Sequence, residues 1–353
     1  MSQTTLSLYR QDRFPIFQNR MYDSMKEARD CPKGDIDLVE DLHTGLVRNA
    51  AFRPEVMNYD THYQNEQALS PLFRSHLDSV ADLIEATMGR KALVEVGCGK
   101  GFFLEMLLAR GVDVTGFDPT YEGQNPKVRR EYFSRDLGMR GEGLILRHVL
   151  EHIPSPVEFL HELAAANGHR GLIYIEVPCF DWICQNRTWF DIFYEHVNYF
   201  RFSDFQHIFG RVAHGERGFG GQYLTVVADL ASLRQPLLDP QDRVAFPPDF
   251  TARLAAETTK PIGHSVVWGA ASKGVIFALL RERAGQPIDL VIDINPAKQG
   301  RFLPGTGLQV VSPAQALATL AAGSIIYVMN SNYLQEIRAM TNNSFTYVGM
   351  SHD

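Results

Sequence analysis

The sequence predicts an α/β fold with two Rossmann-like sheets in one chain of 353 residues, preceded by an irregular N-terminal segment. Short apolar runs alternate with helical patterns from about residue 90, which is typical of a mainly parallel sheet. A stretch at 232–250 that is rich in proline and polar residues interrupts this alternation, which restarts beyond it in a smaller unit. We therefore expect three parts, at 1–80, 81–235 and 236–353.

Each part is expected to contain the following elements. The first part is irregular until a helix with apolar residues at helical spacing begins near Ser70 or Pro71 and ends at Thr87. The second part has buried strands at 92–96, 112–117, 144–147 and 171–176, a weaker candidate at 131–134, helices at Phe102–Arg110 and Pro156–Ala165, and a late edge strand at Tyr223–Ala228. The third part has strands at Ser265–Trp268, Leu290–Asp293 and Ile325–Met329, and helices at Val275–Glu282 and Pro313–Leu320.

The composition excludes several classes of protein. Hydrophobic residues make up 45% and charged residues 21% of the chain, an ordinary globular balance, and the net charge is -7. An acidic balance argues against a nucleic-acid partner, which needs a basic face. The N-terminus lacks the apolar core of a signal peptide, and no run approaches the ~18 apolar residues of a membrane span. The cysteines are scattered, so a reducing cytoplasm is the expected location.

The most informative segment is a glycine-rich turn between a predicted strand and a predicted helix. Gly97, Gly99 and Gly101 occupy alternate positions directly after the strand that carries Glu95. Glycines allow a sharp turn and the close approach of a ligand to the backbone. A dinucleotide fingerprint would place its last glycine at the next position, where this chain has the bulky Phe102.

S-adenosylmethionine fits this pattern better, because it carries an ammonium, a sulfonium and a ribose diol but no pyrophosphate. Glu95 at the strand end can face the ammonium, directly or through water. Asp118, which ends the second strand, can accept hydrogen bonds from both ribose hydroxyls. The combination predicts S-adenosylmethionine as cofactor and S-adenosylhomocysteine as product, with a structural turn that binds no ligand as the alternative.

Other residues near the predicted sheet edge are candidates for the same pocket. Arg147 and His148 follow a strand at the carboxyl edge, where ligands bind in such sheets. Asp136 and Leu137 follow the weaker strand candidate and could meet the adenine. A purely structural role is the alternative for all of them.

The third part contains a second glycine-bounded turn, Gly269–Gly274, that includes Ser272 and Lys273. Its backbone N–H groups and the lysine charge would suit a phosphate of a nucleotide-linked small molecule. A tight turn between strand and helix explains the same residues. Gln222, after two glycines, could hydrogen-bond a substrate, or it lies in a plain loop before the edge strand.

Four further segments form a pattern together: Phe190–Phe200, Trp268–Gly274, Asp293–Gly300 and Leu303–Thr306. They resemble the sugar C-methyltransferase family, whose members methylate a carbon of nucleotide-linked keto-sugars; the first segment is similar to its YxEHxxYF region. The resemblance covers about residues 45–353. It implies a central methyltransferase domain and a C-terminal Rossmann-like domain that helps to hold the substrate.

The resemblance also bears on the N-terminal part. It implies that the segment before the first sheet strand closes over the cofactor, so that Tyr63 and Ser70 contact it; a packing segment is the alternative. The family usually opens with a zinc ribbon carrying two cysteine pairs. Here Cys31 stands alone and His43 lies where a second pair is expected, whereas tetrahedral zinc needs four ligands. No zinc is expected.

The resemblance places the chemistry at the segment around His196, the expected base, because an imidazole with a pKa near ~6.5 can remove a proton beside a ketone at neutral pH. Glu195 would orient it or contact the substrate, and Tyr194 or Tyr199 would stabilise the enolate oxygen. Phe193 stands where the family has tyrosine. Tyr194 then acts from a shifted position, or the substrate is not a nucleotide sugar. A structural histidine in an aromatic cluster is the alternative.

Three functions are compatible with these observations. The first is C-methylation of a keto-sugar nucleotide or related small metabolite, through an enolate and in-line methyl transfer. The second is O- or N-methylation of a non-sugar small metabolite. The third is a catalytically silent protein that binds S-adenosylmethionine. The expected partner in each case is a small molecule, without nucleic acid or membrane, and the sequence leaves the oligomeric state open.

Overall fold

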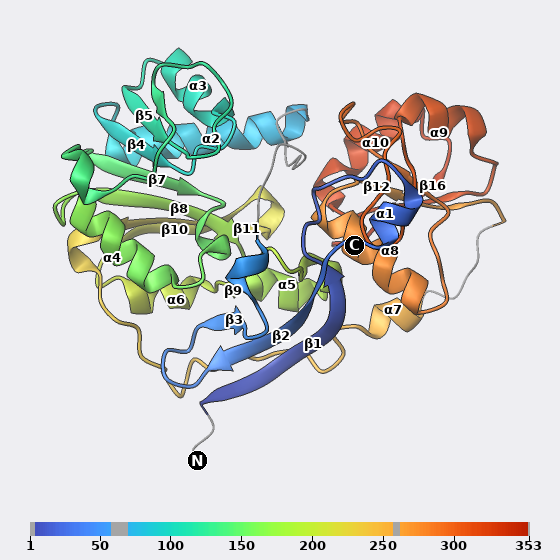
Figure 1. The fold of residues 1–353 in the computed structure, drawn as a ribbon, viewed down its shortest axis with the longest axis horizontal. Coiled ribbons are helices and arrows are strands. Elements are labelled where there is room, and N and C mark those ends of the chain that lie inside the picture. Colours follow the sequence, from blue (N-terminus) through green and yellow to red (C-terminus); the bar gives the residue numbers. More distant parts are fainter. Residues whose placement is uncertain (1–3, 58–69, 257–261, 352–353) are drawn as a thin grey trace.

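The computed structural model describes residues 4–57, 70–256 and 262–351. A seven-stranded sheet and a five-stranded sheet, both accompanied by helices, lie side by side, and a four-stranded sheet runs across the lower side of the view in Figure 1. The two Rossmann-like units that the sequence predicts are confirmed. None of the helices described here has the length and apolar character that crossing a bilayer requires.

The seven-stranded sheet has the order β10-β11-β8-β7-β4-β5-β6, and only β11 runs antiparallel to its neighbours. The chain builds outward from β4 to β6 and then returns to start β7 on the other side of β4. Ligands bind at such a reversal point, beyond the carboxyl ends of the strands. The strands are β4 (Leu93–Val96), β5 (Val114–Phe117), β6 (Val128–Arg129), β7 (Gly143–Arg147), β8 (Leu172–Pro178), β10 (Val212–Gly218) and β11 (Tyr223–Asp229).

Helices cover both faces of this sheet, which explains why its central strands are apolar throughout. Ile145 of β7 belongs to the hydrophobic cluster of α2 and α3, whereas its neighbours Leu144 and Leu146 belong to that of α4. Successive side chains of a strand point to opposite faces, so every position of β7 needs an apolar partner. The helices are α2 (Pro71–Met88), α3 (Phe102–Ala109), α4 (Pro156–Ala166), α5 (Phe180–Asn186) and α6 (Phe202–Ile208).

The five-stranded sheet is parallel throughout, in the order β14-β13-β12-β15-β16. Its reversal point lies between β12 and β15, so its ligand edge also follows from the topology. The strands are β12 (Ser265–Trp268), β13 (Leu290–Ile292), β14 (Val310–Val311), β15 (Ile325–Val328) and β16 (Thr346–Gly349). The helices of this part are α7 (Ala252–Ala256), α8 (Ser272–Arg283), α9 (Pro313–Thr319) and α10 (Leu334–Met340).

The N-terminal part is an ordered antiparallel sheet, so the expectation of an irregular segment is wrong. Buried Ile36 and Leu38 alternate with Asp35 and Asp37 along β2, the pattern of a half-buried strand. The sheet is completed by β9, which pairs with β3 from a distant part of the chain. Its elements are β1 (Thr5–Pro15), β2 (Lys33–Asp41), β3 (Val47–Asn49) and β9 (Asn198–Tyr199), with α1 (Met25–Arg29) between β1 and β2.

Two other expectations need correction. The weaker strand candidate at 131–134 is not a strand; β6 lies just before it, at Val128–Arg129, where it pairs with β5. The boundary at residue 80 falls inside α2, whose buried face packs on the seven-stranded sheet. The unit built on the seven-stranded sheet therefore includes the whole of α2.

One hydrophobic core holds the three parts together. Trp189, which precedes β9, stacks on Phe277 of α8 with ring centroids 5.3 Å apart, and Phe14 of β1 belongs to the same cluster. Arg283 of α8 also donates hydrogen bonds to the carbonyl oxygens of Asp12 and Arg13. These contacts fix the two larger sheets relative to each other.

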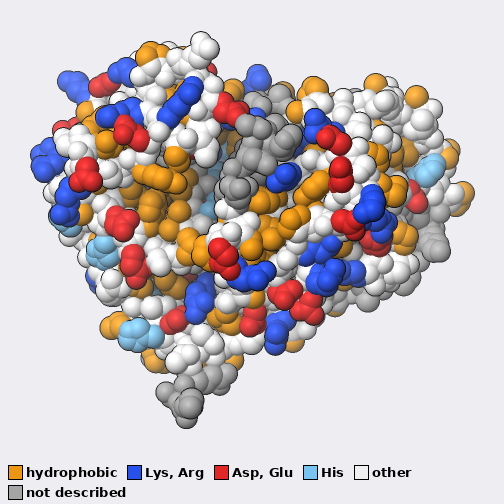
Figure 2. Space-filling model, in the orientation of Figure 1, with side chains coloured by type: hydrophobic (Ala, Val, Ile, Leu, Met, Phe, Trp, Pro, Cys, Tyr) orange, Lys and Arg blue, Asp and Glu red, His pale blue; other side chains and the backbone are white. Residues whose placement is uncertain are grey.

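The surface carries charges of both signs. Figure 2 shows Lys and Arg side chains interspersed with Asp and Glu over the face in view, without a broad basic field. This agrees with the net charge of -7 and gives no support to a nucleic-acid partner.

Replacement of Gly274 by alanine is expected to destabilise the C-terminal unit. An added Cβ would lie 1.9 Å from the carbonyl oxygen of Gly269, so the first turn of α8 must shift. Overpacking of this kind typically costs about 1–3 kcal/mol, and chemical denaturation measures it. The control is Gly210→Ala, whose Cβ would meet nothing closer than 3.4 Å. Equal stability of the two variants would contradict the packing described here.

Candidate active site

A cavity of about 300 Å³ lies between the two larger sheets, at the carboxyl ends of their parallel strands. The first sheet supplies the segments after β7 and β8, and the second supplies those after β12, β13 and β15. Several predicted residues that are distant in sequence meet here: Ser70, His148, Glu195, His196, Gln222, Ser272 and Lys273. The cavity also contains residues that the sequence analysis did not assign to it: Asn19, Glu151, His152, Asn295 and Lys298.

The glycine turn after β4 has the conformation that its sequence predicts. Gly97, Gly99 and Gly101 have φ angles of 72°, 53° and 80°, in the left-handed region that favours glycine. A Cβ on Gly97 would lie 2.5 Å from Cγ2 of Val149. Because Val149 follows directly on His148, the turn packs against the segment that forms the cavity wall.

Glu95 carries an unsatisfied carboxyl group at the end of β4. Its side chain is 3% exposed, and Oε2 has no hydrogen-bond partner within the described part of the chain. Burial raises the pKa of Glu95 to about 8; Arg147 opposes this shift and Asp118 adds to it. A buried carboxyl with an open acceptor beside a glycine turn fits the ammonium group of S-adenosylmethionine.

Asp118 is held at the end of β5 by the glycine turn itself. Its Oδ2 accepts a hydrogen bond from the Gly99 N–H at 2.7 Å, and its Oδ1 accepts from the backbone and hydroxyl of Thr120. A carboxylate offers about four acceptor positions. Three of these positions are used, so one is left for a hydroxyl of the ribose. The second ribose hydroxyl would have to displace the Thr120 hydroxyl.

Arg147 lies in the sheet rather than at the wall of the cavity, which Glu95 and Asp118 do not line either, so its role at the cofactor stays a prediction. Its Nε donates to Oε2 of Glu176 on β8 at 2.9 Å, and its guanidinium lies 4.5 Å from the centroid of the Phe103 ring. Tyr174 donates to the same Glu176 oxygen, and His76 of α2 contacts the other at 2.7 Å. Arg147 thus neutralises a buried carboxylate.

The charge on Glu176 also determines the state of His148. Burial alone would raise the pKa of Glu176, but Arg147 and the hydrogen bonds from His148 and His76 hold it well below its usual value. Burial lowers the pKa of His148, whereas Glu151 and Glu176 raise it, with a net value of about 9. His148 is therefore an imidazolium at neutral pH, at the wall of the cavity.

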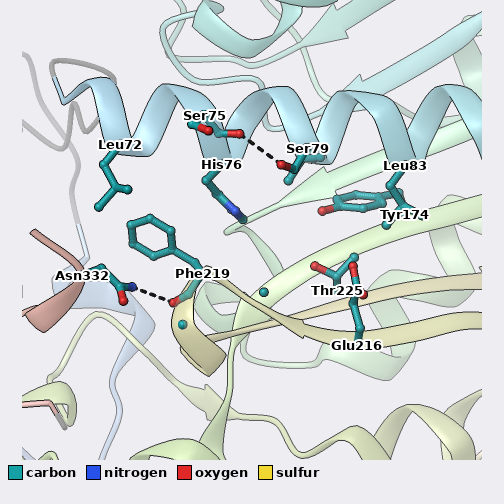
Figure 3. A pocket seen from close by; sticks show the side chains of 13 residues that line it. Leu72, Ser75, His76, Ser79, Leu83, Tyr174, Glu216, Phe219, Thr225 and Asn332 are labelled. Atoms are coloured by element: carbon teal, nitrogen blue, oxygen red, sulfur yellow. Dashed lines mark hydrogen bonds between the residues drawn. The ribbon is translucent and has the colours of Figure 1, made fainter. Parts of the chain in front are cut away.

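A second cavity of about 370 Å³ lies beneath α2, where His76 and Phe219 face each other (Figure 3). Asn332 closes one end through a hydrogen bond to the Phe219 carbonyl. None of the predicted site residues lines this cavity. Since His76 and His148 both contact Glu176, the carboxylate lies between the two cavities.

His196 is 8% exposed and packs among rings, with centroid distances of 4.0 Å to Phe193 and 4.9 Å to His152. Burial and the neighbouring His152, His148 and Lys273 hold the pKa of His196 well below its usual value, so the ring is neutral at pH 7. The neighbouring Glu195 accepts a hydrogen bond from the Gln18 N–H at 3.3 Å.

Tyr194 and Tyr199 do not reach the cavity, which corrects their expected catalytic role. The Tyr194 hydroxyl accepts a hydrogen bond from the Arg53 N–H at 2.9 Å, and its ring fills the space above Gly34. The Tyr199 hydroxyl exchanges hydrogen bonds with the backbone of Phe193 at 3.1 Å. Both hydroxyls therefore stabilise the backbone around the site through hydrogen bonds.

The remaining cofactor candidates are divided. Asp136 is exposed on the 3₁₀ helix η2 (Arg135–Leu137), and Leu137 packs against the core, so neither lines the cavity. Ser70 caps α2 and donates to Oε2 of Glu336 at 2.9 Å, inside the cavity. Tyr63 lies outside the described residues.

Cys31, at which the sequence raised the question of zinc, is buried, and burial raises the pKa of its thiol. The absence of zinc there stays a prediction.

The turn at the start of α8 is already engaged by protein groups. Lys273 pairs with Oδ2 of Asp191 at 2.7 Å and donates to Gln222 at 2.9 Å. Asp293 accepts a hydrogen bond from the Ala270 N–H at 2.7 Å, in the manner of Asp118 in the first sheet. These contacts weaken the interpretation of the turn as a phosphate site.

Comparisons with known proteins agree with this architecture. Residues 62–212 match a family described as a methyltransferase domain, and residues 249–349 match a C-methyltransferase C-terminal domain. The chain is 25% identical over 300 residues to the C-methyltransferase NovU of Streptomyces niveus, covering 72% of this chain and 71% of NovU. These matches indicate a methyltransferase that uses S-adenosylmethionine.

Solved structures that resemble this methyltransferase do so at low identity. One is the Burkholderia thailandensis 1,6-didemethyltoxoflavin-N1-methyltransferase, with 15% identity, coverage of 52% of this chain and 94% of that chain, and a TM-score of 0.34. Another is the magnesium protoporphyrin IX methyltransferase of Synechocystis PCC 6803, with 17% identity, coverage of 44% and 80%, and a TM-score of 0.32.

Glu95 is expected to make the ligand-free methyltransferase less stable as pH rises. Its pKa is about 8 when folded against 4.5 when exposed, so the folded state holds a proton that the unfolded state loses between these values. The free energy of unfolding therefore falls between pH 4.5 and about pH 8, by on the order of a few kcal/mol. This dependence on pH should be absent in Glu95→Gln.

Thermal unfolding at several pH values measures this effect, with the exposed Glu105→Gln as the matched control. Calorimetry should show that Glu95→Gln binds S-adenosylmethionine more weakly while Glu105→Gln does not. An unchanged pH slope in Glu95→Gln would overturn the assignment.

Glu176→Gln is expected to destabilise the fold by about 3–5 kcal/mol, because it leaves Arg147 and His148 buried without their carboxylate. Denaturation at pH 7 measures the loss. Asp30→Asn, which removes an exposed pair with Lys26, should leave stability unchanged. Similar midpoints for the two variants would refute the role of Glu176.

Proposed function

We propose that this methyltransferase transfers the methyl group of S-adenosylmethionine to a carbon next to a ketone in a small metabolite, of the keto-sugar kind, with His196 as base. The observation that carries the proposal is a neutral, buried imidazole in the cavity between the two sheets. The match of residues 249–349 to a C-methyltransferase C-terminal domain supports the choice of a carbon acceptor.

The reaction needs a base because a carbon beside a ketone must lose a proton before it can attack the methyl group. The transfer itself is an in-line displacement that depends on alignment. The lowered pKa of His196 means that its ring nitrogen holds no extra proton in the resting protein and has a lone pair for the acceptor proton. Its ring is held in place by Phe193 and His152, which keeps it aimed at one position.

The enolate that forms needs positive charge or a hydrogen-bond donor nearby. Tyr194 and Tyr199 do not supply it, since their hydroxyls are bound to backbone groups. His148 carries a positive charge at the same cavity wall, and Nδ2 of Asn295 is a buried donor with no partner among the described residues. We assign charge stabilisation to His148 and substrate binding to Asn295.

The donors at the cavity also bear on the substrate class. Because Lys273 is neutralised by Asp191, the turn at the start of α8 favours neutral polar substituents, such as sugar hydroxyls, over a phosphate group. The nucleotide of a nucleotide-linked sugar would then extend out of the cavity.

O- or N-methylation of a non-sugar metabolite is the second candidate. It is favoured by the positions of Tyr194 and Tyr199, whose hydroxyls bind backbone groups outside the cavity, since a heteroatom acceptor forms no enolate. His196 would then remove a more acidic proton, and its loss would matter less.

Incubating the purified protein with a metabolite extract and isotopically methyl-labelled S-adenosylmethionine should produce one labelled small molecule. Mass spectrometry identifies it, and fragmentation locates the added carbon. A label on oxygen or nitrogen would select the second candidate. Binding of the cofactor without any labelled product would indicate a silent binding protein.

His196→Asn is expected to lower kcat by about 10²–10⁴-fold with little change in cofactor affinity, because the base acts only on the acceptor. Tyr194→Phe removes one hydroxyl of the same segment outside the cavity, so it should reduce stability but retain kcat. Wild-type turnover in His196→Asn would exclude enolate chemistry at this residue.

A further inference from the structure

Three potential metal ligands meet at one end of the active-site cavity. Glu151 and His152 lie on the 3₁₀ helix η3 (Leu150–His152) after β7, and His196 lies just before β9. One ligand atom from each side chain lies within 4.8 Å of the other two. The cluster is distinct from Cys31, where the sequence raised the question of zinc.

The donor atoms of this cluster are available to a cation. Oε2 of Glu151, which is 1% exposed, and Nδ1 of His196 are buried and have no hydrogen-bond partner in the described chain. Nδ1 of His152 donates to the Glu195 carbonyl at 2.8 Å, which leaves the lone pair on Nε2. Metal-binding histidines are commonly oriented by such a bond from their other nitrogen.

We propose that Glu151, His152 and His196 bind a divalent transition-metal ion of the Zn²⁺ class, with the cavity at its open position. Two histidines and one glutamate are an established ligand set for zinc sites that keep one position open. Tetrahedral Zn–N bonds of about 2.0 Å place ligand atoms about 3.3 Å apart. The side chains must therefore approach by up to about 1.5 Å from the separation in this structure.

Charges of both signs line the cavity around this cluster. The carboxyl groups at its wall are Glu151, Asp191, Glu195, Asp293 and Glu336, and the lysines are Lys273 and Lys298. His148 contacts Glu151 only through Oε1, at 3.3 Å. The other oxygen of Glu151 remains open to the metal.

Metal binding should inhibit methyl transfer, a consequence that rests on the proposed function. A metal on Nδ1 of His196 leaves the ring proton on the other nitrogen, so the imidazole has no lone pair for the substrate proton. Zinc and the acceptor proton thus compete for one side chain. The binding site itself does not depend on the identity of the reaction.

Isothermal titration of metal-free, full-length protein with Zn²⁺ at pH 7.5 should show one ion bound per chain. Glu151→Gln and His152→Gln should each weaken binding at least about tenfold. The exposed His43→Gln and His264→Gln, outside the cavity, are the controls and should bind as the wild type does. Co²⁺ in place of Zn²⁺ adds a visible absorption that reports the ligands even if a variant is less stable.

The methyltransferase assay completes the test. Labelled methyl transfer should fall with Zn²⁺ over the range in which the titration shows binding, and a chelator should restore it. Binding that survives both Glu151→Gln and His152→Gln would overturn the site, and binding without inhibition would overturn the competition for His196. If His196→Asn keeps full turnover, the proposed role of His196 as base is wrong. The metal site is tested separately, by whether the wild-type protein binds one zinc ion per chain.

Discussion

The apolar contact between α8 and the segment around Trp189 determines where the cavity between the two larger sheets forms. The Trp189 ring stacks on Phe277, and Phe190 meets the same ring edge-on, all fully buried. Such pairs contribute about 0.5–1.5 kcal/mol beyond the area that they bury. Since the chain runs from this contact directly to His196, the contact fixes the proposed base relative to the second sheet. The cavity thus forms between the carboxyl edges of both sheets, as neither sheet alone would provide it.

The second constraint is electrostatic and acts through Glu176. A fully buried carboxylate is tolerated only with cationic partners, which Arg147 at the end of β7 and the adjacent His148 supply, while His76 of α2 contacts the same carboxylate. The consequence for the site is that His148 keeps its proton, while His196 in the same cavity is neutral. The pKa of His148 is raised and that of His196 is lowered, so at one pH the same pocket contains a charged imidazole and a neutral one. Enzymes commonly separate acid and base roles by shifting the pKa values of two groups in opposite directions.

The sequence predicted those parts of the molecule that depend on neighbouring residues. Gly97 to Gly101, Glu95 and Asp118 lie within one strand–turn–helix–strand unit, so their arrangement follows from local backbone geometry. In the N-terminal sheet, the alternation along β2 is a local signal of a strand, whereas the pairing of β3 with β9 depends on the folded chain, because Val47 gives no sign of Tyr199. The partners of Arg147 and Tyr194, which are Glu176 and the Arg53 backbone, are likewise known only once the chain has folded.

Buried polar atoms without a partner are rare in folded proteins, and each costs about 1–3 kcal/mol. In the described structure, Glu151 Oε2, His196 Nδ1 and Asn295 Nδ2 are such atoms at the cavity, and Glu95 Oε2 is one at the end of β4. Apolar residues of similar size would be more stable at these positions, so core packing does not explain why polar groups lie there. A ligand that supplied the missing partners would offset this loss of stability.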